Sequence, residues 1–91
     1  MRIVWTGRAS SDAGRLHEFL AEVNPRAAKA VMHRLIVAPR RLVEAPRSGE
    51  RLAAFAPREI RRILAGDYEL RYELVDDTIY ILRVWHTRED R

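Results

Sequence analysis

Charged residues alternate along one stretch of the sequence, where Glu69, Arg71 and Glu73 are separated by an apolar and an aromatic residue. If this stretch is a strand, all three side chains lie on one face of a sheet, together with His86 from the following strand. Imidazole titrates near neutral pH and suits proton transfer, while a guanidinium offsets charge that develops on a phosphate. The same alternation is typical of a solvated sheet face, with Arg62 and Glu69 as a cross-strand ion pair. We favour the ion-pair interpretation and keep the catalytic one as an alternative.

The basic residues are concentrated in one segment. Residues 24–47 contain six cations and one acid, a local charge of +5, whereas the whole chain carries +4. Nearly all the cations are Arg, which binds carboxylate and phosphate groups through two bonds, so an acidic protein segment and a nucleic acid both fit as partners. A coding bias toward Arg, combined with solvated helix faces, explains the Arg count equally well.

Length and composition exclude several classes of protein. With 91 residues the chain forms one domain, 1–91, which has room for a single core but not for a large cofactor enzyme. It has no Cys and its three His show no metal-ligand spacing, so we expect no disulfide, metal or cofactor. No apolar stretch is long enough to span a membrane and no signal-peptide pattern opens the chain, so we expect a cytoplasmic protein without membrane contact.

The first quarter of the chain predicts a strand and then a helix. Alternation over 1–6 indicates a short strand that ends at Gly7. Ser10 or Ser11 can then cap a helix over roughly 10–23. Its buried stripe is expected to consist of Ala13, Leu16, Phe19, Leu20 and Val23.

A second helix is predicted to fold back on the first as a hairpin. Asn24 and Pro25 end one helix and start the next, because Asn caps a helix and Pro is tolerated in its first turn. The second helix is expected to run toward residue 44, with a kink or an early end at Pro39, which lacks an amide hydrogen. Its predicted buried residues are Ala28, Val31, Met32, Leu35, Ala38 and Leu42, and a separate face is basic.

The second half predicts a three-stranded antiparallel meander, because the hydrophobic period becomes alternating after the turn at 45–49. Strands are expected over about 59–64, 68–75 and 78–86, joined by tight turns at 66–67 and 76–77. The chain is therefore predicted to have an α+β fold in which the N-terminal strand joins the meander and both helices pack on one face of the sheet.

The turn at 76–77 sets a register that decides which side chains share a face. The face toward the helices is expected to contain the pairs Leu74–Ile79, Tyr72–Ile81, Leu70–Arg83 and Tyr68–Trp85. The other face is expected to be open, with Glu69, Arg71, Glu73, Tyr80, Leu82, Val84 and His86. Tyr80 is the aromatic residue expected there, whereas core packing is favoured for most of the others.

Several segments together resemble the RelE/ParE family of bacterial toxins, and its ParE-like members most closely. They are NPRAA at 24–28, PRSG at 46–49 and, above all, GDYELRYE at 66–73 followed by IYILRVWHTRED at 79–90. The resemblance covers nearly the whole chain. It implies the toxin half of a type II toxin–antitoxin pair, of the kind linked to plasmid stabilisation. The implied partner is a ParD-like or RelB-like antitoxin, through which alone the toxin contacts operator DNA.

Members of the family act in at least two ways: RelE-like toxins cleave messenger RNA on the ribosome, and ParE-like toxins poison DNA gyrase. The nucleases usually have Arg where this chain has Glu69, and a carboxylate there repels phosphate. A long basic hairpin that begins with Asn-Pro also resembles ParE-like members, so we favour gyrase. The alternative is ribosome-dependent cleavage, with Arg71 and His86 as the catalytic pair and Arg62 or Arg83 assisting. A relative that has lost its toxicity and persists as a binding module is a third alternative.

The charge distribution also predicts where the antitoxin binds. We expect a C-terminal antitoxin segment, apolar with acidic flanks, to lie across the helix hairpin and the sheet edge. Its acidic residues are expected to pair with Arg26, Lys29, Arg40 and Arg41.

Overall fold

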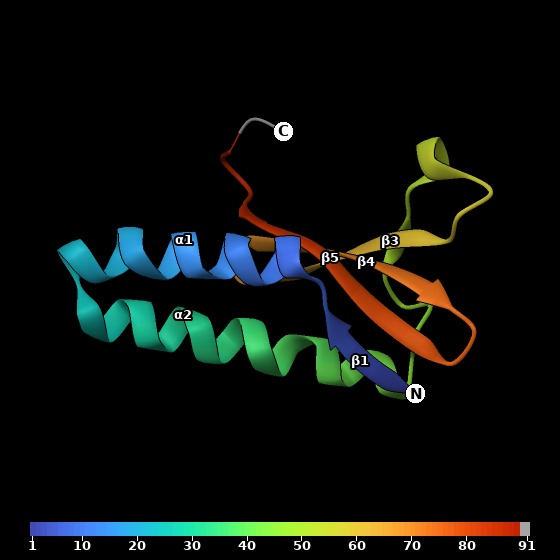
Figure 1. The fold of residues 1–91 in the computed structure, drawn as a ribbon, viewed down its shortest axis with the longest axis horizontal. Helices are drawn as coiled ribbons and strands as arrows, with labels where there is room; N and C mark the ends of the chain where they lie inside the picture. The colour runs from blue at the N-terminus through green and yellow to red at the C-terminus, as the bar shows by residue number, and fades with distance from the viewer. Residues whose placement is uncertain (90–91) are drawn as a thin grey trace.

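A computed structural model describes residues 1–89 and shows an α+β fold, in which a helix hairpin packs against a five-stranded sheet (Figure 1). In chain order the elements are β1 (Arg2–Trp5), α1 (Gly7–Val23), α2 (Pro25–Val37), the 3₁₀ turn η1 (Ala38–Val43), β2 (Glu50–Arg51), the 3₁₀ turn η2 (Ala53–Phe55), β3 (Ile60–Ala65), β4 (Tyr68–Val75) and β5 (Thr78–His86). The strand order is β1-β5-β4-β3-β2, with β1 parallel to β5 and all other pairs antiparallel. The predicted fold class is confirmed, whereas β2 and η2 were not predicted.

The helix α1 begins earlier than predicted. Thr6 caps it, because its Oγ1 accepts a hydrogen bond from the amide of Ala9 at 3.2 Å. The same hydroxyl donates to the carbonyl of Ile81 at 2.8 Å, which ties the start of α1 to β5. The predicted serine cap was therefore wrong, because Thr6, which lies between β1 and Gly7, already caps the first turn.

The junction between the helices follows the prediction. Asn24 caps α2 by accepting from the amide of Ala27 at 3.1 Å, and Pro25 occupies the first helical position. The α-helical pattern ends at Val37, and Pro39 lies in the 3₁₀ turn that follows, so the early end is confirmed.

Only part of the helix hairpin is packed against the sheet. Leu16 and Leu35 are buried as predicted, but Phe19 and Val23 are 69% and 83% exposed. Figure 1 shows why, because the far ends of α1 and α2 extend beyond the sheet and have no strand beneath them. The apolar period of α1 correctly predicted a helix but not the point at which its packing partner ends.

A β-bulge interrupts the pairing of β4 with β5. The pairs Leu74–Ile79 and Tyr72–Ile81 form as predicted. The register then shifts, and Leu70 pairs with Val84 and Tyr68 with His86. Leu82 is the additional residue of this bulge, and every later side chain of β5 therefore points to the opposite face from the one predicted.

The bulge corrects the predicted placement of four residues. Val84 is fully buried toward the helices, and the His86 ring contacts the Tyr68 ring edge-on, with 5.1 Å between centroids. Arg83 and Trp85 move to the open face. Asp12 of α1 explains the geometry, because its carboxylate accepts a hydrogen bond from the Val84 amide at 2.9 Å beyond the end of β1.

No helix within residues 1–89 combines the length and the apolar character that crossing a bilayer requires.

Candidate functional site

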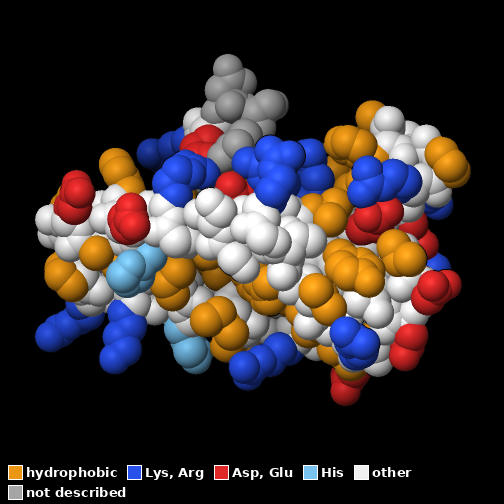
Figure 2. Space-filling model, viewed as in Figure 1, with side chains coloured by type: hydrophobic (Ala, Val, Ile, Leu, Met, Phe, Trp, Pro, Cys, Tyr) orange, Lys and Arg blue, Asp and Glu red, His pale blue; other side chains and the backbone are white. Residues whose placement is uncertain are grey.

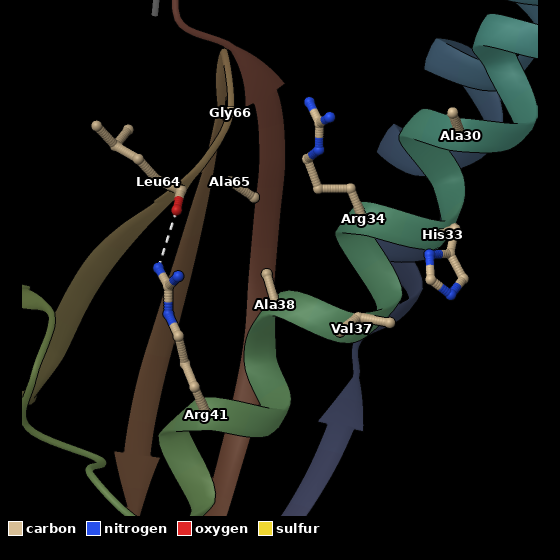
Figure 3. A pocket seen from close by; sticks show the side chains of 9 residues that line it. All are labelled: Ala30, His33, Arg34, Val37, Ala38, Arg41, Leu64, Ala65 and Gly66. Carbon is tan, nitrogen blue, oxygen red and sulfur yellow. Dashed lines mark hydrogen bonds between the residues drawn. The ribbon is translucent and has the colours of Figure 1, made fainter.

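A groove of about 560 Å³ lies between α2 and the outer edge of β3, and it is the first candidate for partner binding (Figure 3). His33, Arg34 and Val37 line one wall, and the end of β3 with the turn that follows it, residues 64–66, lines the other. Figure 3 shows the Arg41 side chain reaching across the groove, where Nη2 donates to the Leu64 carbonyl at 2.9 Å. The groove therefore combines two guanidiniums with an exposed strand edge.

The edge of β3 is open because its neighbour is short. The strand β2 pairs with β3 only at Arg61 and Arg62, so within the described residues Ile63–Ala65 have no strand partner on that side. Leu64 is 55% exposed. An unpaired strand edge offers backbone donors and acceptors to an extended segment of another chain.

The four cations predicted to bind the antitoxin do not all line this groove. Arg41 does, whereas Arg26, Lys29 and Arg40 are exposed outside it. Figure 2 shows Lys and Arg side chains projecting from the outer edge of α2, below the hairpin. Arg34 was missed, although it precedes Arg41 by two helical turns, a spacing that indicates a shared side.

The open face of the sheet carries ion pairs across its strands. Arg58 donates to both oxygens of Glu73, at 2.9 and 2.7 Å, and these bonds hold the pKa of Glu73 below its ordinary value of 4.5. Arg62 donates to Glu69 at 3.1 Å, which confirms the predicted pair, and it also pairs with Glu50. Glu69, Glu73 and Glu50 are thus each paired with an arginine.

Arg71 lies at the centre of the open face between two aromatic rings. The carbon of its guanidinium is 4.7 Å from the centroid of the Trp85 ring and 5.2 Å from that of Phe55. Its Nη2 is 3.8 Å from a Glu69 oxygen, and its buried Nε has no hydrogen-bond partner among the described residues. The sequence did not reveal this stacking, because η2 was not predicted and Trp85 was assigned to the other face.

Asp12 and Arg83 form a largely buried ion pair that joins α1 to the sheet. Arg83 Nε and Nη2 donate to the two Asp12 oxygens at 2.8 and 3.2 Å, which raises the pKa of Arg83 above its ordinary value. The Asp12 side chain is only 8% exposed. Sequence reasoning missed this residue, although it lies between Ala9 and Leu16 on the buried stripe of α1, where an acid needs a partner.

The four candidate catalytic residues are only partly brought together. Arg62, Arg71 and Arg83 are direct neighbours across β3, β4 and β5 on the open face. His86 is on the other face, beside Tyr68 and α1. Glu69, Glu73 and Tyr80 occupy the open face as predicted, since Glu73 pairs with Tyr80 ahead of the bulge. His17 and His33 are exposed, and no cluster of metal-ligand side chains exists within residues 1–89.

Comparison with known proteins agrees with the predicted resemblance. A family model described as the ParE toxin of type II toxin–antitoxin systems, parDE, matches residues 3–91. Two relatives are toxins of Caulobacter vibrioides. Toxin RelE2 is 33% identical over 85 residues, 93% of each chain, and Toxin RelE1 is 35% identical over 85 residues, 92% of this chain and 90% of the relative.

A solved structure of the chromosomal ParDE system from P. aeruginosa contains a chain with the same fold. Its TM-score is 0.79 at 17% identity, with 94% of this chain and 95% of the other covered. Because the family model spans almost the whole sequence and two curated toxins match over more than nine-tenths of it, the chain belongs to the ParE toxin family of type II toxin–antitoxin systems.

Proposed function

We propose that this toxin inhibits growth by binding and poisoning DNA gyrase, without cutting RNA. The observation that carries the proposal is the separation of His86 from Arg71 by the sheet. Cleavage of RNA through its 2′-hydroxyl needs a proton acceptor and a phosphate-binding cation within hydrogen-bond reach of the same substrate. With the imidazole on the helix side, this pair of residues does not meet that requirement.

Glu69 adds a second argument against RNA cleavage. Its side chain is 8% exposed and its carboxylate is held by Arg62, next to Arg71. The negative charge of Glu69 disfavours a phosphate at this position and neutralises Arg62, a cation that would otherwise stabilise the reacting phosphate. Arg62 and Arg83 are similarly occupied, by Glu50 and Asp12.

The alternative is a ribosome-dependent ribonuclease of the RelE type. Two relatives carry RelE names, and Arg62, Arg71 and Arg83 are adjacent on one face. In that case Arg71 and Arg83 would offset charge on the phosphate with Arg62 assisting, and His86 would have to act from the rim of the sheet.

Expression of the toxin without its antitoxin separates the two functions. Gyrase poisoning predicts filamentous cells with DNA damage and intact transcripts, and His86→Ala should stay toxic, as should the control His17→Ala on the exposed side of α1. Ribonuclease activity predicts arrested translation with cleaved transcripts and a loss of toxicity in His86→Ala alone. Both candidate targets are cytoplasmic, and so we expect the toxin to act in that compartment.

We further propose that the antitoxin neutralises the toxin by filling the groove beside α2. An extended antitoxin segment would pair with the free edge of β3, with apolar side chains over Val37 and Leu64. Its acidic residues would contact Arg34 and Arg41 inside the groove, while Arg26, Lys29 and Arg40 attract its flanks. Residues 24–43 contain no acid that would oppose this contact.

A further inference from the structure

A second hollow, of about 550 Å³, lies on the open face of the sheet, away from the groove beside α2. The start of α1 forms one side, Phe55 and Arg58 of the η2 loop form another, and Arg71 and Arg83 form the floor. In Figure 2, Lys and Arg side chains gather over the N-terminal end of α1 and continue toward the η2 loop. Neither gyrase inhibition nor antitoxin binding, as proposed above, accounts for this hollow.

Four guanidiniums line the hollow, three from α1, β4 and β5 and one from the loop after η2, and two of them are neutralised. Arg58 is paired with Glu73 and Arg83 with Asp12. The Arg8 side chain makes no hydrogen bond or ion pair within residues 1–89, and the Arg71 guanidinium has only a long ionic contact to Glu69, whose carboxylate is already bonded to Arg62. Arg8 and Arg71 therefore leave positive charge uncompensated at the hollow.

The start of α1 adds backbone donors to this charge. The amides of Gly7 and Arg8 belong to the first turn and have no acceptor within the helix. The first turn contains no acid, so nothing in it offsets the positive end of the dipole of this 17-residue helix. Together with the uncompensated guanidiniums, these donors suit the oxygens of a phosphate group.

We propose that this hollow binds the phosphodiester backbone of a single-stranded nucleic acid. Arg8, Arg71 and the amides at the start of α1 contact phosphate, and Phe55, which is 37% exposed and lines the hollow, stacks on a base. A basic groove beside an aromatic ring is the usual arrangement for binding single strands without sequence preference. An acidic peptide would use the cations but not the ring.

The chemistry of the lining favours binding without cleavage. The residues that line the hollow in the described part of the chain include no His and no carboxylate, so no side chain there can accept a proton from a 2′-hydroxyl near neutral pH. Glu69 lies outside the hollow, on the far side of Arg71. The proposed site shares Arg71 and Arg83 with the candidate catalytic set but contains neither His86 nor Arg62.

Fluorescence anisotropy with labelled dT15 and U15 oligonucleotides, over a salt titration, tests the proposal on the full chain. Both oligonucleotides should bind saturably, with affinities within about threefold of each other, because the site contacts phosphates and stacks on bases, which both contain. For a single strand each phosphate contact contributes about −0.7 to the slope of log K against log salt. Arg8→Gln should therefore reduce the magnitude of this salt slope by about 0.7 and weaken binding several-fold. Arg26→Gln, which has the same net charge, should leave the slope and the affinity unchanged.

Two further measurements complete the test. Phe55→Leu should weaken binding without changing the salt slope, because it removes stacking and no charge. Equal losses in Arg8→Gln and Arg26→Gln would contradict the proposal, since they indicate general attraction to a basic protein. Displacement of the oligonucleotide by poly-glutamate as readily as by unlabelled dT15 would also overturn it, in favour of an acidic protein partner.

Discussion

The cations along α2 and η1 and the cations on the open sheet face have different surroundings. Arg58, Arg62 and Arg83 on the sheet side are each bonded to a carboxylate. Along 24–43 the cations are exposed and have no acid within the segment. Carboxylates that are largely buried need a partner within the fold, whereas exposed cations need none and remain available to another molecule. We infer that the sheet-side arginines and their carboxylate partners form a structural group. The exposed cations of α2 and η1 form a recognition group.

Removing the buried acid of the structural group should have the largest effect. Asp12→Ala leaves the Arg83 guanidinium and the Val84 amide without their acceptor at the junction of α1 and β5. The free energy of unfolding should fall by about 3 kcal/mol, as expected when one partner of a buried pair is lost. Urea denaturation measures this change. Glu18→Ala, on the exposed side of the same helix, is the control and should stay within about 0.5 kcal/mol of the wild type.

Charge reversal in the recognition group should affect binding and not folding. The double variant Arg34→Glu, Arg41→Glu places two negative charges in the groove, and antitoxin affinity at low salt should fall by about 30-fold, or roughly 2 kcal/mol. The effect should shrink as salt is raised. Arg26→Glu with Lys29→Glu, outside the groove, should cost less. Calorimetry at low salt measures antitoxin affinity. Equal affinities of the groove variant and the wild type for the antitoxin would show that the groove does not bind it.

Arg71 tests the boundary between the two groups, since it is stacked but poorly paired. Arg71→Ala removes two cation–aromatic contacts, and the free energy of unfolding should fall by about 1 kcal/mol. Arg26→Ala, on the exposed surface of α2, should change it by less than about 0.5 kcal/mol. Identical denaturation curves for the two variants would show that the stacking contributes nothing. A loss of toxicity in a folded Arg71→Ala variant would place a functional surface on the sheet.

The smallest expected effect is the loss of the Arg58–Glu73 pair of the structural group when the pH is lowered. The bonds from Arg58 hold the pKa of Glu73 below 4.5 in the folded chain, so the ionised form favours folding. This contribution is complete above the pKa of the unfolded state and is lost as the pH falls through the lower folded value. Unfolding measured between pH 6 and about pH 3 should show a smaller loss in Glu73→Gln than in the wild type. The exposed Glu22→Gln should follow the wild type, and a parallel profile for Glu73→Gln would contradict this role.

The local signals in the sequence predicted most of the fold. Asn24 and Pro25 mark the helix junction, Pro39 ends the α-helical pattern, and alternation reveals the strands of the meander. Each of these depends on backbone chemistry within a few residues. For the same reason the ion pair of Arg62 with Glu69 was predictable, since strand spacing brings the two together.

The features that were not predictable depend on contacts between distant segments. The bulge at Leu82 accompanies a hydrogen bond from Val84 to Asp12, which is 72 residues away in the sequence. A register is inferred outward from its turn, so one such shift changes the face of the sheet on which every later side chain of the strand lies. For this reason His86 was assigned to the wrong face. The groove also depends on the shortness of β2, which no residue pattern indicated.

The central claim is that this toxin poisons gyrase by binding, and side-by-side assays on one purified sample test it most directly. The wild-type chain should inhibit supercoiling by gyrase and accumulate cleaved DNA, while messenger RNA on translating ribosomes stays intact. Cleavage of ribosome-bound messenger RNA by the wild type, abolished by His86→Ala and accompanied by unimpaired gyrase, would contradict the account.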